Sequence, residues 1–435
     1  MKKILILSSL TALLYVQSGC TQQTFLNPST ASQPQVIGTA DGLITVCNAL
    51  QFRFSTGGVV SVLYNAMAAG GLTTNELQVL NAGNSEELAL SQGQANVTNG
   101  NGVARNLWTQ CNLVKANADL VLANLATATD PGTRSGIQGY AAIFRALSLG
   151  TLAQFFQTAP IVVGENAPFV DRTVLFREAV ATLEAAATQV ASAPVSANFT
   201  TKAVPGIDIA NTIQALIARY SLFAGDFDKA IAAAARVDLT KRSVFRFDDN
   251  TRNPVFFAAF GNVNVIAPTN NTLGLPAALA PTVADRRLAV YIRPTPVATL
   301  NLGTGFFTAN NTEIPVYLPG EMLLIQAEAF ARKSDLTNAV AQLNRVLTKT
   351  AAQDVFGVGA ALPAYAGAVT ATDVLTEIYR NRQIELAYQG FRLEDSRRFG
   401  RPGPGAVGSE RNRNFMPYPR TETDNNTNAP TADPG

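Results

Sequence analysis

The part of the sequence richest in charged chemistry is residues 377–400, where arginine and carboxylate side chains recur at helical spacings. Glu385, Arg392, Asp395 and Arg398 carry the pattern, in a protein in which only 15% of residues are charged. Arginine donates hydrogen bonds in a rigid planar fork, so a partly buried ion network here would fix how the helix docks. A solvated helix face with isolated ion pairs would stabilise little. The spacing alone leaves both interpretations open.

The sequence offers little for catalysis. It contains no histidine, which excludes histidine-based triads and histidine metal ligands. It has no phosphate-binding loop, nucleophile elbow or complete dinucleotide-binding fingerprint. The acid pairs Glu86-Glu87 and Asp248-Asp249 are adjacent in sequence, so their side chains point apart and we expect both pairs to be solvated. We therefore predict that the protein is not an enzyme and needs neither metal nor cofactor.

Two long segments rich in asparagine and glycine, residues 71–100 and 240–318, are the candidates for a ligand-binding face. The second segment concentrates aromatic residues, and it has no helical period that would bury them. Exposed rings stack on apolar ligand faces, while asparagine amides form hydrogen bonds with the hydroxyl groups of a sugar or the backbone groups of a peptide. The candidate side chains are Tyr291, Phe306, Phe307, Asn310 and Tyr317. Packing of the aromatic members against the helices is the alternative. Trp108 could also hold a sugar, but beside Leu107 we expect it in the core.

A repeated helical hairpin indicates the scaffold. Residues 218–237 and 327–346 align with matching alanines, a matching aspartate at the turn and a matching Arg-Val end. Two alanines twelve residues apart across a short turn, as at Ala218 and Ala230, suit the contact of tightly packed antiparallel helices, as in tetratricopeptide pairs. The fold class predicted is mainly α, with a tetratricopeptide-like helical-pair scaffold and a large, loop-rich, irregular region that faces the ligand.

The other expected helices follow from caps and apolar periodicity. They are two segments within 40–70, broken at 56–58 and at Gly70-Gly71, then Asn101 to about Leu125, Asp130 to about Gln157, and Asp171 to about Ala191. Thr370 or Thr372 caps the helix that carries the charged motif, and Gly390 interrupts it. Residues 351–369 read as a loop.

The N-terminus has the architecture of a secretory signal, with Lys2-Lys3, an apolar run and small residues before Cys20. Cys20 resembles the lipidated cysteine of a bacterial lipobox, so residues 1–19 would be cleaved and residues 20–39 would form a lipidated tether. The formal net charge of +2 gives no reason to expect nucleic acid as a partner. Cys47 and Cys111 could pair as a disulfide in an oxidising compartment, but the sequence does not show their separation.

The motif Arg382-x-x-Glu385-Leu-Ala-x-x-Gly390-x-Arg392-x-x-Asp395-x-x-Arg398 resembles the C-terminal helix motif of the SusD/RagB family of outer-membrane nutrient-binding lipoproteins. It departs from the family pattern at Asn381, Gln389 and Phe391, and none of these is one of the Arg, Glu or Asp positions of the motif. The resemblance implies one helical domain over residues 40–435, with an irregular insertion at about 240–318.

The same resemblance implies a function. It implies a lipid-anchored protein of the outer membrane, facing the cell surface, that captures a glycan or peptide. It also implies delivery to a SusC-like TonB-dependent transporter as the partner. Two alternatives stay open: a helical-repeat lipoprotein that binds only proteins, and an α-helical glycan-degrading enzyme that uses acid pairs.

Overall fold

The computed structural model describes residues 36–435, apart from residues 262–263 and 293–304. The predicted signal peptide, Cys20 and most of the predicted tether therefore lie outside the described residues. No helix of the described chain is both long and apolar enough to cross a membrane.

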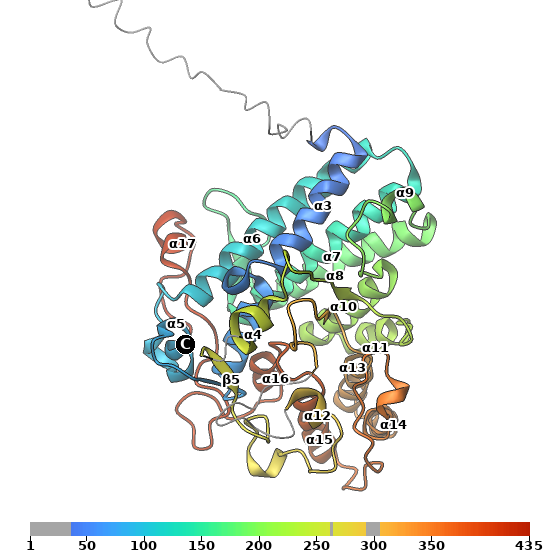
Figure 1. Ribbon diagram of the computed structural model, residues 1–435. Coiled ribbons are helices and arrows are strands. Elements are labelled where there is room, and N and C mark those ends of the chain that lie inside the picture. Colours follow the sequence, from blue (N-terminus) through green and yellow to red (C-terminus); the bar gives the residue numbers. More distant parts are fainter. Residues whose placement is uncertain (1–35, 262–263, 293–304) are drawn as a thin grey trace, which may run out of the picture.

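The N-terminal half is helical, as predicted, and is built around α7. Its main helices are α3 (Ala40–Ser55), α4 (Val62–Leu72), α6 (Gly102–Ala123), α7 (Pro131–Phe155) and α8 (Arg172–Ser192). Helix α7 is buried along almost its whole length, because α3, α6 and α8 pack around it (Figure 1). Side chains of Asn101, Asp130 and Asp171 cap α6, α7 and α8, which confirms the predicted starts of these helices.

The predicted break at Gly70-Gly71 is wrong, because α4 runs through both glycines. They serve close packing instead. A Cβ atom at Gly70 would lie 2.8 Å from the carbonyl oxygen of Gly390, and one at Gly71 would lie 2.5 Å from Cδ1 of Leu77. The two glycines therefore let other segments approach the helix closely.

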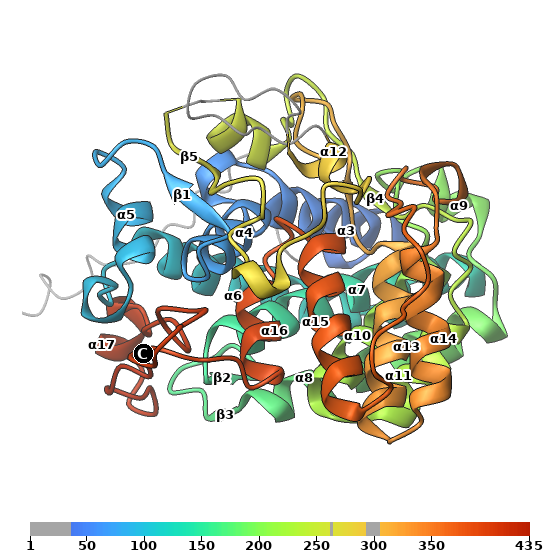
Figure 2. The ribbon, with the colours of Figure 1, turned by 90° about the horizontal axis from the view of Figure 1, so that it is seen from below.

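The two predicted hairpins are present. The first is α10 (Ile209–Ala224) with α11 (Phe227–Ala235), and the second is α13 (Pro319–Arg332) with α14 (Leu336–Leu347). The alanines expected at the contacts are buried, including Ala230 and Ala339 at 0% exposure. In Figure 2 the four helices lie together, and α11 packs on α13, so the hairpins stack as tetratricopeptide-like pairs.

The charged motif spans two helices with a turn between them. Helix α15 (Ala371–Glu385), capped by Thr370, packs on α13 and ends at Glu385, five residues before Gly390. The turn includes Tyr388 at φ 61°, and α16 (Arg392–Arg398) follows it. The prediction that the first helix continues to Gly390 is therefore wrong, since Tyr388 already has a left-handed backbone.

The irregular region contains only short elements, as predicted. Its strands and helices are β4 (Val244–Phe245), the π-helix η4 (Phe256–Phe260), β5 (Ile266–Pro268), η5 (Ala277–Leu279), α12 (Leu288–Tyr291) and β6 (Ile314–Pro315). Elsewhere the short elements are η1 (Gly58–Val60), β1 (Leu77–Val79), α5 (Ser85–Gln92), η2 (Gln94–Asn96), η3 (Leu125–Thr127), β2 (Thr158–Pro160), β3 (Phe169–Asp171), α9 (Ala197–Thr200), η6 (Ala351–Gln353) and α17 (Arg420–Asn425).

Three antiparallel pairs, β1–β5, β2–β3 and β4–β6, connect these elements. The β1–β5 pair sets Leu77 opposite Pro268 and Val79 opposite Ile266. Strand β1 belongs to the first asparagine-rich segment and β5 to the second. The pairing therefore brings both candidate ligand-facing segments to one side of the molecule (Figure 2).

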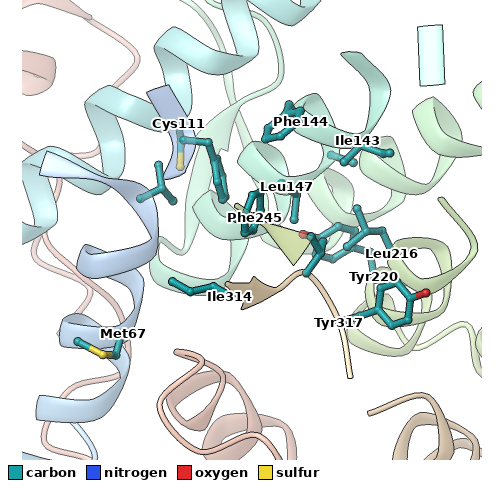
Figure 3. Packing of buried hydrophobic residues seen from close by; sticks show 14 of the residues in the cluster. Met67, Cys111, Ile143, Phe144, Leu147, Leu216, Tyr220, Phe245, Ile314 and Tyr317 are labelled. Atoms are coloured by element: carbon teal, nitrogen blue, oxygen red, sulfur yellow. The ribbon is translucent and has the colours of Figure 1, made fainter. Parts of the chain in front are cut away.

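One large apolar core joins the helices to the irregular region. Figure 3 shows Phe144 and Leu147 of α7 beside Phe245 of β4, and the Phe144 and Phe245 ring centroids are 6.3 Å apart. Trp108 is 3% exposed and stacks on Phe169, so it is a core residue, as expected. Cys47 and Cys111 are both buried free thiols, so they do not form the disulfide that the sequence left open.

Candidate functional site: a hollow beside Phe257

The charged motif forms a buried ion network, which decides between the two interpretations of its spacing. Asp395 is 1% exposed and accepts hydrogen bonds from Nε of Arg382 at 2.9 Å and from Nη1 of Arg398 at 2.8 Å. Arg398 also pairs with Glu328 of α13 at 2.7 Å. Burial alone would raise the pKa of Asp395, but the two guanidinium groups outweigh it and hold the pKa below its usual value.

Glu385 belongs to a neighbouring buried cluster. Its carboxylate lies 3.1 Å from Nη1 of Arg287 and 3.0 Å from Nζ of Lys349. A Cβ atom at Gly320 would overlap this carboxylate, so only glycine fits at that position. Arg287 and Lys349 went unpredicted because they are far from Glu385 in sequence and belong to no motif. The cluster fastens the irregular region to the end of α15.

Arg392 does not join Asp395. It donates to the carbonyl oxygen of Leu273 at 2.5 Å, and its Nη2 lies 3.5 Å from Glu76. The expected single cluster of Arg392, Asp395 and Arg398 is therefore wrong, because the turn before α16 directs Arg392 toward β1. Glu385, Arg392, Asp395 and Arg398 therefore all connect α15 or α16 to other segments of the fold.

The expectation of exposed aromatic side chains around Phe306 is also wrong. Tyr291, Phe306, Phe307 and Tyr317 are between 0% and 7% exposed. They pack the irregular region onto the helices, and the hydroxyl of Tyr291 donates to the carbonyl oxygen of Glu385 at 2.6 Å. Asn310 is half-buried, and its backbone carbonyl accepts a hydrogen bond from the backbone N–H of Asn253 at 2.6 Å. These aromatic side chains are buried because burial removes their apolar surface from water, even though the segment that carries them has little regular secondary structure.

A surface hollow of about 790 Å³ lies where the two candidate segments meet, and we call it the Phe257 hollow. It is lined by Gly57, Gly58, Val59, Tyr64, Asn65, Asn84, Glu86, Glu87, Gly102, Val103, Arg105, Asn106, Phe257, Ala258 and Val265. Helices α4, α5 and α6 supply most of the polar wall, and the π-helix η4 supplies the apolar wall. A hollow of this size, with one aromatic wall and a few convergent polar groups, is typical of a small-ligand site.

Phe257 is the exposed aromatic group of this hollow. Its side chain is 47% exposed, although its neighbours Ala258 and Phe260 are buried. The backbone of Gly58, at φ 59°, approaches the ring closely, since a Cβ atom there would lie 3.4 Å from the ring. The guanidinium carbon of Arg252 lies 4.8 Å from the ring centroid. π-helical turns are rare and frequently occur at functional sites.

The polar wall is partly fixed by hydrogen bonds within the protein. Glu86 accepts from the backbone amide of Gly102 at 2.6 Å, and Glu87 accepts from the hydroxyl of Tyr64 at 2.7 Å. Glu87 is only 9% exposed, so the expectation that both acids are solvated is wrong for Glu87. Burial, followed by the nearby Glu87 carboxylate, raises the pKa of Tyr64 and keeps its hydroxyl a donor. Arg105 is exposed and makes no ion pair with the described residues.

Residues of both segments singled out by the sequence line the hollow, but none of the side chains singled out as ligand contacts does. Phe256, Phe257 and Phe260 are clustered in the sequence, but the spacing gives no sign of which ring is exposed. A π-helical register decides that, and no sequence period reveals it. No cluster of three or more metal-ligating side chains occurs in the described part of the chain.

Comparison with known proteins agrees with this architecture. Residues 285–433, which include the whole charged motif, match the SusD family model. A search of curated proteins gives no significant match.

Solved structures share the fold at low sequence identity. A SusD superfamily protein from Bacteroides vulgatus is similar with a TM-score of 0.68 and 15% identity, over 89% of this chain and 96% of that chain. A SusD-like carbohydrate-binding protein from the same species has a TM-score of 0.62 and 17% identity, over 82% and 83% of the two chains. A SusD-like carbohydrate-binding protein from Bacteroides fragilis has a TM-score of 0.63 and 14% identity, over 90% and 99%.

The charged motif, the stacked helical hairpins and these similarities point to one conclusion. The chain is SusD/RagB-like, in the sequence of residues 285–433 and in its mainly α, tetratricopeptide-like fold.

Proposed function

We propose that this chain is a carbohydrate-binding protein that captures a glycan in the Phe257 hollow without cleaving it. The observation that carries the proposal is the half-exposed ring of Phe257 beside amide and carboxylate groups in a hollow of about 790 Å³. An aromatic face stacks on the apolar face of a sugar, while amides and carboxylates bind its hydroxyl groups.

Two further points support capture over cleavage. Two of the structures that share this fold are described as carbohydrate-binding proteins. Glu86 and Glu87 are adjacent on α5, and each already accepts a hydrogen bond from the protein. A glycosidase needs two carboxyl groups on opposite sides of the scissile bond. Analysis of products after long incubation would detect cleavage.

The cellular setting is also part of the proposal. We propose cleavage after residue 19, lipidation of Cys20, a tether through residue 39 and one helical domain from residue 40. The lipid would hold the protein at the outer membrane, facing the cell surface. From there the protein would pass its ligand to a SusC-like TonB-dependent transporter.

A glycan and peptide array on the purified protein tests the proposed activity. We expect glycan binding that Phe257→Ala weakens at least ten-fold, about 1.4 kcal/mol, because stacked aromatics are frequent anchors. Phe52→Ala is the matched control, since Phe52 is 58% exposed on α3 and does not line the hollow. Peptide binding in place of glycan binding, or equal effects of the two substitutions, would reject this site and function.

A further inference from the structure

The three asparagines of the Phe257 hollow have fixed orientations. Asn65 donates from Nδ2 to the carbonyl oxygens of Val59 and Ser61, at 2.8 and 2.7 Å. Asn84 Nδ2 donates to the carbonyl oxygen of Asn264 at 2.8 Å, and Asn106 Nδ2 donates to that of Val59 at 3.1 Å. A backbone carbonyl can only accept, so each asparagine must present its NH₂ group to the backbone.

This arrangement leaves the three side-chain carbonyl oxygens as acceptors. None of them accepts a hydrogen bond from the described residues, and Asn65 Oδ1 is fully buried without a partner. A buried polar atom without a partner costs free energy. Asn84 and Asn106 are partly exposed, so a ligand in the hollow that donates hydrogen bonds would bind their two oxygens, while the oxygen of the fully buried Asn65 adds to the acceptor character of the wall behind them.

The charged groups of the hollow act in the same direction. Glu86 and Glu87 each use one carboxylate oxygen within the protein and keep the other as an acceptor. Arg105 is the single basic side chain among the lining residues. Its guanidinium faces two carboxylates among the lining residues, and a second guanidinium, that of Arg252, lies over the Phe257 ring. The charges therefore nearly balance, and the hollow has no excess of positive charge that would hold an anionic ligand.

We propose that the ligand is recognised mainly as a hydrogen-bond donor: a glycan whose sugars carry free hydroxyl or amino groups at this hollow. Carboxylated or sulfated sugars at the same position are disfavoured, because an anionic group brings further acceptors to a wall whose free polar groups are mostly acceptors. This inference rests on the proposed function and narrows its substrate class.

Oligosaccharides of one linkage in neutral, amino, uronate and sulfated forms test the inference on the purified protein. We expect the neutral and amino forms to bind, and the uronate and sulfated forms to bind at least ten-fold more weakly. Glu86→Gln should narrow that difference, because a glutamine oxygen can still accept from Gly102 while the negative charge is lost. Arg105→Gln should strengthen binding of the amino form, most clearly at low salt. Lys241→Gln, at an exposed site that does not line the hollow, controls for overall charge.

The outcomes separate this inference from the proposed function. Phe257-dependent binding that is restricted to uronate or sulfated glycans, and lost in Arg105→Gln, would overturn the inference and leave glycan capture standing. Equal binding of all four forms, unchanged in Glu86→Gln, would overturn it as well. Absence of any Phe257-dependent glycan binding would reject the proposed function itself.

Discussion

At the residue scale, Asp395 is a junction of the fold. Its carboxylate connects α15, through Arg382, with Arg398 of its own helix, and Arg398 reaches Glu328 of α13. The network is deeply buried: Arg382 donates to Asp395 through Nε and Nη2, and its Nη1 has no hydrogen-bond partner in the described chain. Removal of one charge from such a network leaves the others without compensation.

We therefore predict that Asp395→Ala costs about 3–5 kcal/mol of unfolding free energy, measured by denaturant titration. The contribution should be present at neutral pH and lost in acid, because a carboxyl whose pKa is lowered by folding loses its stabilisation as the pH falls through the folded value. Asp424→Ala is the control, since its pair with Arg420 is highly exposed and screened by solvent. Full stability of Asp395→Ala, together with loss of ligand binding, would place this network in the binding site instead.

Lys115 gives a second prediction at this scale. It is fully buried on α6 and donates to the carbonyl oxygen of Pro160 at 2.5 Å. Burial is the main cause that lowers its pKa from 10.5 to about 8. Between about pH 8 and 10.5 the unfolded chain keeps this proton and the folded chain has lost it, so stability should rise with pH in that window.

The expected gain from Lys115 is about 3 kcal/mol, at about 1.4 kcal/mol for each pKa unit. Lys115→Met should abolish this gain, because methionine has a similar length and does not titrate. Denaturant titrations at several alkaline pH values give the unfolding free energy of both proteins. The contribution of the other titrating groups is the same in both, so it cancels in the difference between them. Parallel stability curves for the two proteins would contradict the prediction.

At the scale of elements, the hairpins show which structural features the sequence alone predicts. In both repeats the turn residue has positive φ, 82° at Gly225 and 64° at Ser334, and the aspartate after it caps the second helix. These are local signals, so the sequence contains them. The buried positions of Phe306 and Tyr317 and the partner of Arg392 depend on segments far away in the sequence, and no local pattern encodes them.

The helix contacts should be intolerant of large side chains. Ala230→Leu and Ala339→Leu are each predicted to cost about 1–3 kcal/mol, because both alanines are fully buried where two helices meet. The same substitution at Ala232 and Ala341, which are exposed on the same two helices, should change the melting temperature little. Equal effects at buried and exposed positions would show that overpacking is not the cause.

At the scale of the whole molecule, the region proposed to face the ligand arises from pairing between distant segments. Strands β1 and β5 join residues 77–79 to residues 266–268, and the Phe257 hollow lies beside this junction. Composition led to the prediction that both segments face a ligand, because long asparagine- and glycine-rich insertions seldom serve only as connections. It could not show that they meet, or that Phe257 would be the exposed ring. Those features follow from the tertiary fold.

The proposed membrane attachment of the whole molecule depends on the predicted lipid at Cys20. Several acyl chains on one cysteine anchor firmly, since each buried methylene contributes about 0.8 kcal/mol. Cys20→Ala should therefore move the protein from the membrane fraction to the soluble fraction, measured by fractionation and by the mass of the N-terminal peptide. Cys47→Ala is the matched control, because Cys47 is a buried thiol of the core and its loss should leave the protein with the membrane. A wild-type N-terminus without acyl mass, with an unchanged membrane fraction in Cys20→Ala, would reject the anchor and leave the fold and the Phe257 hollow unaffected.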